Sequence, residues 1–135
     1  VANEAVDEIT AGGWTSSYTG RPLSRNILTQ AISTISNRLD LNKEDTVLEL
    51  GVAGGLTLSH IAPLVKSYYG IDKSAAMVAR ARQLTARAGL SNVHLSVGLA
   101  NDLKNFPKVD LVLMVGLTQS LPDKETIADV VLSAL

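Results

Sequence analysis

The run ELGVAGG at residues 49–55 combines an acidic side chain with three glycines in a segment as short as a tight turn. Glycine lets the backbone turn sharply and approach a ligand closely, and the amino terminus of a following helix offers free N–H groups to polar or anionic atoms. A nicotinamide-dinucleotide fingerprint would have glycine where this chain has Gly51, Ala53 and Leu56, so the run fails it at two positions. The spacing favours a ligand without a pyrophosphate, whose carboxylate and amine lie over the turn. Taken alone, the run is equally compatible with an ordinary glycine turn.

Asp72 strengthens the ligand-binding interpretation. It ends a second strand-like run, roughly 20 residues beyond Gly51, where an acidic side chain accepts hydrogen bonds from two vicinal ribose hydroxyls. Its charge also disfavours a 2′-phosphate. The alternative is that Asp72 caps the next helix, a role for which Ser74 competes. Because the turn and the acid occur together at this separation, we favour the ribose interpretation.

These residues act together only if the fold brings them to one edge of a sheet. Strands are predicted at 46–50, 67–72, 93–97 and 109–115, and helices from Arg21-Pro22 to about Arg38, over 56–65, over 75–88 and from Lys124 onward, with a short helix and a loop within 1–20. Strand–helix alternation with short turns predicts an α/β fold, a Rossmann-like doubly wound parallel sheet. The last strand is an unbroken apolar stretch, which favours a strand covered on both faces.

Ligands of such sheets bind outside the carboxyl ends of the strands. The segments that follow the four predicted strands are 51–55, 72–73, 98–102 and 115–119. We therefore expect these segments to form a single site.

Composition excludes several classes of protein. The 135 residues include 12 Lys+Arg and 13 Asp+Glu, and the net charge of −1 argues against nucleic-acid binding. The absence of cysteine excludes a disulfide scaffold, a cysteine-ligated zinc site and a thiol nucleophile. No His/Asp/Glu spacing indicates a metal. No apolar stretch reaches the length of a membrane span and the amino terminus lacks the layout of a signal peptide, so we expect a cytoplasmic protein.

The length allows one domain. We predict an N-terminal helical or lid segment over 1–40 and a Rossmann-like core over 41–135. The sequence starts at Val1 rather than at methionine and ends inside a predicted helix, so we expect a segment of a longer chain whose core is truncated at its C-terminus.

Two groups of motifs resemble class I S-adenosylmethionine-dependent methyltransferases. The segments 47–55, 69–74 and 109–112 resemble the general pattern of that class. The segment GWTSSYTGRP at 13–22 resembles the W-x-S-S-Y-x-G-x-P motif of methyltransferase domains embedded in polyketide synthases and nonribosomal peptide synthetases, and VGLTQSLP at 115–122 resembles their N-S-V-V-Q-Y-F-P segment. The resemblance covers residues 13–135 and implies a seven-stranded sheet in the order 3-2-1-4-5-7-6, of which this chain has about four strands.

The resemblance also implies residues that bind S-adenosylmethionine. Glu49 would orient the methionine amine, directly or through water, and the glycine turn would pass beneath the methionine. Asp72 would hold the ribose, Lys73 would flank the adenine, 99–102 would border its amino edge, and 115–116 would line the wall near the sulfur. Tyr18 would close over the cofactor. The implied cofactor-binding residues are Tyr18, Glu49, Gly51, Ala53, Gly55, Asp72, Lys73, Leu99, Ala100, Asn101, Val115 and Gly116.

Several residues depart from the pattern, among them Lys73, which stands where an apolar residue often packs on adenine. Ala53 replaces the usual middle glycine, which is tolerated if the residue is not at positive φ. Leu99 stands where many methyltransferases carry an acid, and Val115 replaces the Asn of the embedded domains. No catalytic base is identified, because His60, predicted to face solvent, and His94 both lie away from the expected methyl-transfer position.

The resemblance implies methyl transfer to a polyketide or peptide intermediate tethered to a carrier domain, with neighbouring synthase domains as partners. Two alternatives keep the fold. One is a freestanding small-molecule methyltransferase, and the other is a degenerate, non-catalytic structural domain, for which Ala53 and Leu99 are the motivation. A nicotinamide dehydrogenase is disfavoured by the failed fingerprint.

Overall fold

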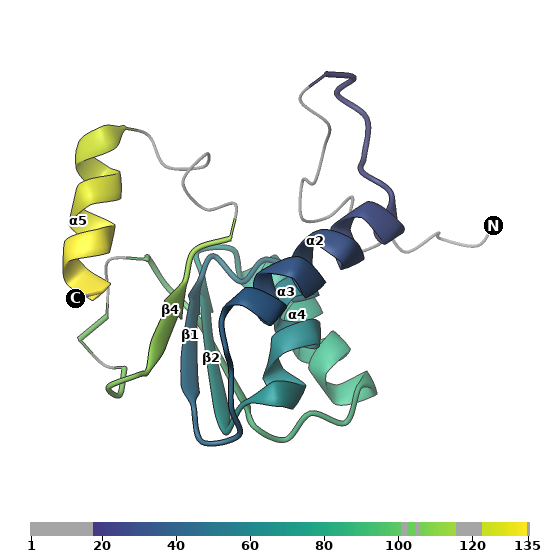
Figure 1. Ribbon diagram of the computed structural model, residues 1–135. Helices are drawn as coiled ribbons and strands as arrows, with labels where there is room; N and C mark the ends of the chain where they lie inside the picture. The colour runs from purple at the N-terminus through teal and green to yellow at the C-terminus, as the bar shows by residue number, and fades with distance from the viewer. Residues whose placement is uncertain (1–17, 101–102, 105, 116–122, 135) are drawn as a thin grey trace.

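The computed structural model describes residues 18–100, 103–104, 106–115 and 123–134 (Figure 1). In chain order the elements are α2 (Arg25–Arg38), β1 (Thr46–Leu50), α3 (Leu56–Ile61), the 3₁₀ turn η1 (Ala62–Leu64), β2 (Ser67–Asp72), α4 (Ala75–Arg87), β3 (Val93–Val97), β4 (Leu111–Leu113) and α5 (Lys124–Ala134). The short helix predicted within 1–20 falls mostly outside these residues.

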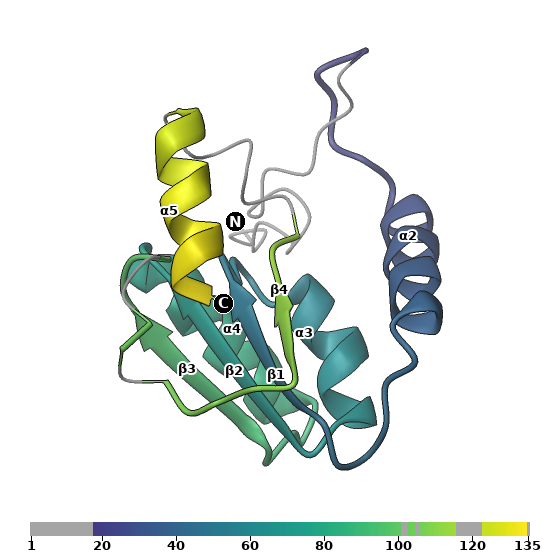
Figure 2. The ribbon, with the colours of Figure 1, turned by 60° about the vertical axis from the view of Figure 1, so that its left-hand side comes forward.

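The four strands form one parallel sheet in the order β3-β2-β1-β4. Figures 1 and 2 show α3 and α4 on one face of the sheet and α5 on the other. Side chains of a strand alternate between the two faces, and β1 shows this directly. Val47 packs into the cluster with Leu58 of α3, whereas Leu48 and Leu50 pack into the cluster with Val130 of α5. The predicted α/β, doubly covered fold is confirmed.

Local sequence signals account for most element boundaries. The first three strands have the predicted bounds. Ser74 caps α4, since its Oγ accepts a hydrogen bond from the Met77 N–H at 3.3 Å, and Gly89 follows the helix at φ 67°. The α-helical part of α3 ends at Ile61, and Pro63 lies in the 3₁₀ turn that follows.

Three predicted elements have other bounds in the structure. The helix predicted over 56–65 is α-helical only over Leu56–Ile61. The helix expected to open at Arg21-Pro22 begins at Arg25, because Ser24 is the residue that caps it: its Oγ accepts from the Ile27 N–H at 3.3 Å. The strand expected over 109–115 is limited to Leu111–Leu113, and Val112 is only half-buried. The prediction from the continuous apolar run therefore made β4 too long and too deeply buried.

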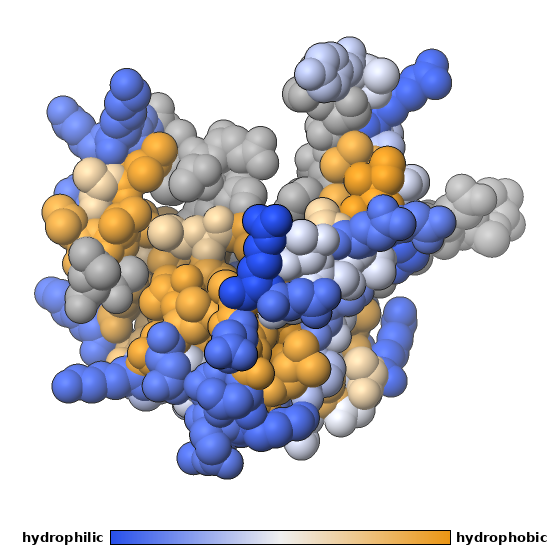
Figure 3. Space-filling view, in the orientation of Figure 1, coloured by the Kyte–Doolittle hydropathy of each residue, from blue (hydrophilic) through white to orange (hydrophobic). Residues whose placement is uncertain are grey.

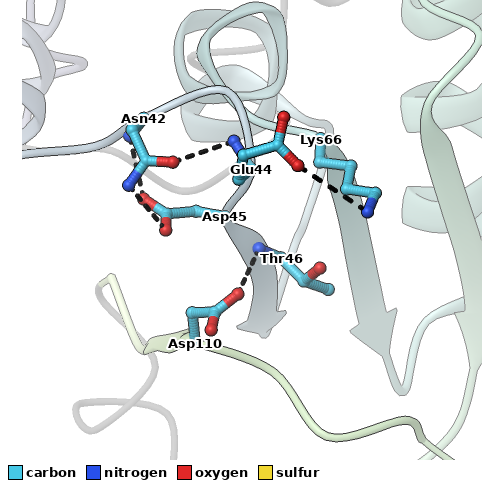
Figure 4. A network of polar contacts seen from close by, with 6 residues as sticks. All are labelled: Asn42, Glu44, Asp45, Thr46, Lys66 and Asp110. Carbon is cyan, nitrogen blue, oxygen red and sulfur yellow. Dashed lines mark hydrogen bonds and ion pairs between the residues drawn. The ribbon is translucent and has the colours of Figure 1, made fainter.

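A polar network fixes the amino-terminal end of the sheet (Figure 4). Asp110 donates its N–H to the Thr46 carbonyl at 2.8 Å and accepts from the Thr46 N–H through Oδ2 at 2.8 Å. Asn42 and Asp45 close the preceding turn, with the Asn42 N–H donating to Asp45 Oδ2 at 2.8 Å. These contacts align β4 with β1 at the end of the sheet opposite the glycine turn.

In the described part of the chain, β4 pairs with β1 alone, so its other edge has no strand beside it. Figure 3 shows apolar side chains gathered over the region of β4 and toward α5. An apolar sheet edge of this kind favours association with another strand.

Candidate functional site

The glycine turn between β1 and α3 is tied to β2 by backbone hydrogen bonds. The N–H groups of Gly51 and Val52 both donate to the Ile71 carbonyl, at 2.8 and 3.1 Å. Gly51 and Gly55 have φ of 78° and 94°, which L side chains rarely adopt. A Cβ on Gly55 would also lie 3.1 Å from the Leu84 side chain. The glycines therefore allow a turn that packs closely against α4.

Ala53 lies at φ 47°. A methyl group at this position would be free of strain only at negative φ, and this condition is not met. A left-handed conformation costs an L residue roughly 1–2 kcal/mol. The turn holds this conformation because its two sides are fixed by hydrogen bonds to β2: the Ala53 N–H donates to Asp72 Oδ2 at 2.9 Å, and Gly51 donates to Ile71.

Ala53→Gly is expected to raise the free energy of unfolding by about 0.5–1 kcal/mol, because the relief of left-handed strain exceeds the entropic cost of glycine. Urea denaturation measures the change. Ala88→Gly is the matched control, since Ala88 has right-handed φ and ψ of −80° and −5° and is exposed. There the same substitution is expected to lower stability by roughly 0.5 kcal/mol. Equal changes in both variants would contradict the assignment of strain to Ala53.

Asp72 joins the glycine turn to the start of α4. Its Oδ2 accepts from the Ala53 N–H at 2.9 Å and its Oδ1 accepts from the Ser74 N–H at 2.8 Å. The side-chain cap of α4 is Ser74, so the competition expected from the sequence is resolved in favour of Ser74. A carboxylate oxygen has more than one acceptor site, so half-buried Asp72 keeps capacity to accept from ligand hydroxyls.

Glu49 lies near the carboxyl end of β1, two residues before Gly51, and is 2% exposed. The Tyr68 hydroxyl donates to its Oε2 at 2.7 Å, and Thr57 makes a further side-chain hydrogen bond to the carboxyl group. Burial raises the pKa of Glu49 to about 8, helped by the charge of Asp72, while the bonds from Tyr68 and Thr57 oppose the rise. Burial also raises the pKa of Tyr68. The carboxyl group is therefore mostly protonated at neutral pH.

Sequence reasoning missed Tyr68. The register shows why it meets Glu49: Val47 lies opposite Tyr68, and Glu49 lies opposite Gly70, so all four face the same side of the sheet. A tyrosine in a buried strand needs a partner for its hydroxyl. An acid on the same face of the neighbouring strand was the signal that could have identified the pair.

The other predicted residues are at the same end of the sheet. Lys73 follows β2 and is exposed, Leu99 and Ala100 follow β3, and half-buried Val115 follows β4. Leu99 is 60% exposed. Asn101 and Gly116 lie outside the described residues, and their roles stay predictions.

Tyr18 precedes α2 and is 97% exposed. Figures 1 and 2 show the segment that leads into α2 on the side of the sheet where the strands end. The expected closure of Tyr18 over a ligand stays a prediction.

Neither histidine lies at the carboxyl end of β1 or β2, where the predicted site residues are found. His60 is half-buried rather than facing solvent, because its Nδ1 lies 2.9 Å from the Leu56 carbonyl oxygen. His94, exposed on β3, stacks on Tyr69 with 4.8 Å between ring centroids.

Among the residues that the structure describes, no group of three or more His, Asp or Glu side chains is arranged to hold a metal. The helices within those residues include none with the length and apolarity to cross a membrane.

Comparison with known proteins identifies the family. The sequence profile of a family described as "Methyltransferase domain" matches residues 47–134. Enniatin synthase of Fusarium equiseti is 33% identical over 141 residues, which cover 94% of this chain and 4% of the synthase. CymA of Salinispora arenicola, a probable non-canonical nonribosomal peptide synthetase, is 27% identical over 140 residues, covering 95% of this chain and 2% of that protein. The chain thus spans a small part of these synthases.

A solved structure, an S-adenosylmethionine-dependent methyltransferase from Thiobacillus denitrificans in complex with S-adenosylhomocysteine, has the same fold. Its TM-score is 0.64 at 20% identity, and the match covers 84% of this chain and 52% of that one. The fold is therefore that of the class I methyltransferases, whose cofactor is S-adenosylmethionine. The chain belongs to the methyltransferase domain family.

The residues at the carboxyl ends of β1 and β2 fit this cofactor chemically. S-adenosylmethionine carries an ammonium, a sulfonium and two ribose hydroxyls, all of which favour carboxyl groups nearby. Glu49 and Asp72 provide two such groups on neighbouring strands, close enough for the charge of Asp72 to raise the pKa of Glu49.

Proposed function

We propose that this domain transfers the methyl group of S-adenosylmethionine to a polyketide or peptide intermediate tethered to a carrier domain, as one domain of a larger cytoplasmic synthase. The proposal is supported by the hydrogen bond from the Ala53 N–H to Asp72 Oδ2, which joins the glycine turn to the acid that we propose to hold the ribose. The relatives support the acceptor class, because enniatin synthase and CymA each match over nearly this whole chain.

Each residue has a binding or orienting task in this proposal. Asp72 accepts from the ribose hydroxyls while it keeps its two backbone hydrogen bonds. Glu49 attracts the methionine amine. Leu99 and Ala100 border the adenine, and Val115 lines the wall near the sulfur. The bound cofactor supplies an activated methyl group, so holding the acceptor in line with it provides much of the rate.

The test compares acceptors. The domain is incubated with S-adenosylmethionine carrying an isotopically labelled methyl group and either an aminoacyl or ketoacyl thioester on a carrier protein or the same acid free in solution. Mass spectrometry then locates the label. Transfer to the tethered acceptor, lost in Asp72→Ala, supports the proposal. Transfer to free acids alone would indicate a freestanding small-molecule enzyme, and cofactor binding without transfer to either would indicate a non-catalytic structural domain.

A further inference from the structure

Tyr68 and Tyr69 are neighbours on β2 with opposite surroundings. Tyr68 is fully buried in the core on the α3 side, and its hydroxyl donates to Glu49. Tyr69 packs on the α5 side and stacks on His94. The Tyr68 hydroxyl thus places a hydrogen-bond donor on the carboxyl group of Glu49, which precedes the glycine turn by two residues.

Three groups act on the Glu49 carboxyl. Tyr68 of β2 and Thr57 of α3 donate hydrogen bonds to it, and both favour its ionised form. Asp72, at the end of β2, opposes ionisation through its negative charge, and burial opposes it more strongly. Of these, Asp72 also contacts the turn itself. A cation bound over the turn would therefore act together with Tyr68 and Thr57 to favour the ionised form of Glu49.

We propose that Tyr68 is a positioning residue of the cofactor site, whose hydroxyl holds the Glu49 carboxyl group in place for the ammonium group of the ligand. The inference rests on the proposed function, since it takes S-adenosylmethionine or its product as the ligand. When the ammonium group binds, Glu49 gives up its proton to solvent and the Tyr68 hydroxyl donates to the resulting carboxylate. Such charge-assisted hydrogen bonds are about twice as strong as neutral ones.

The coupling between ligand binding and the ionisation of Glu49 predicts how many protons are released on binding. With a pKa of about 8, Glu49 holds its proton at pH 7 before the ligand arrives. Binding of S-adenosylhomocysteine at pH 7 is therefore expected to release close to one proton. Calorimetric titration in buffers of different ionisation enthalpy measures this number. Glu49→Gln is expected to release none.

Tyr68→Phe removes only the hydroxyl. We expect this variant to bind S-adenosylhomocysteine roughly 10-fold more weakly at pH 7, because it lacks the hydrogen bond that becomes stronger when Glu49 ionises on binding. Its proton release is expected to persist to higher pH, since the carboxylate has lost a donor. Tyr69→Phe is the matched control: it removes the same atom from the adjacent residue on the opposite face, and it is expected to behave like the wild type.

The outcomes separate the two proposals. Wild-type protein that binds no S-adenosylhomocysteine would overturn the proposed function. Wild-type binding with equal affinity and proton release in Tyr68→Phe and Tyr69→Phe would overturn the role of Tyr68 alone. If Tyr68→Phe does not fold, as judged by circular dichroism, the comparison of wild type with Glu49→Gln still decides: equal proton release in those two would overturn the inference.

Discussion

Asp72→Ala is expected to weaken the binding of S-adenosylhomocysteine by roughly 100-fold, measured by titration calorimetry at pH 7. The variant loses the acceptor proposed for the ribose hydroxyls, and hydrogen bonds to a charged group contribute about 1.5–3 kcal/mol each. It also leaves the N–H groups of Ala53 and Ser74 without their present acceptor, so the hydrogen-bonded link between the turn and the start of α4 is lost. Both effects act on the same site and in the same direction.

Asp110→Ala provides the matched control. Asp110 also accepts a backbone N–H through its carboxylate, from Thr46 at 2.8 Å, but at the opposite end of the sheet (Figure 4). Because this hydrogen bond is exposed, its loss is expected to lower stability by only about 0.5–1.5 kcal/mol while leaving affinity for the ligand unchanged. Equal losses of affinity in the two variants would mean that Asp72 acts through general stability rather than through the ligand.

The second large effect is a dependence of stability on pH that comes from Glu49. Its pKa is raised from 4.5 to about 8 in the folded protein, so the folded state holds a proton that the unfolded state releases between these values. The free energy of unfolding is therefore expected to fall as pH rises from about 4.5 to about 8, by on the order of 5 kcal/mol in total, and this contribution is constant outside that window. The loss is comparable with the whole stability of many domains.

Urea denaturation of the ligand-free protein at intervals between pH 5 and pH 8 measures this dependence. Glu49→Gln replaces the acid by a neutral amide of similar shape and is expected to flatten the curve in that window. Glu44→Gln is the control, because it makes the same chemical change at an exposed position. There Glu44 Oε2 lies 3.9 Å from Lys66 Nζ. A curve for Glu49→Gln that parallels the wild type would contradict a buried protonated carboxyl group.

Much of the fold could be predicted because its signals are local. Strand–helix alternation gave the bounds of three strands, and Ser74 and Gly89 marked the ends of α4. The separation between the glycine turn and Asp72 indicated that they act together, and the structure joins them by a hydrogen bond of 2.9 Å.

The features that could not be predicted depend on contacts between distant parts of the chain. The left-handed φ of Ala53 follows from hydrogen bonds between the turn and β2, so it could not be predicted from the residue types of the turn alone. The pairing of Tyr68 with Glu49 follows from the parallel register of β1 and β2. The short extent of β4 follows from its pairing with Val47–Glu49 of β1 alone, whereas the apolar residues of the sequence continue beyond Leu113.

A crystal structure of the protein with S-adenosylhomocysteine bound would test the proposed cofactor site most directly. We expect both ribose hydroxyls within hydrogen-bonding distance of the Asp72 carboxylate, roughly 2.5–3.0 Å between oxygens. We expect the amino acid portion over residues 51–55, with the ammonium group on the side of Glu49. A ligand whose ribose is held elsewhere, with Asp72 bonded to the Ala53 and Ser74 N–H groups alone, would contradict the central claim that the glycine turn and Asp72 form one cofactor site.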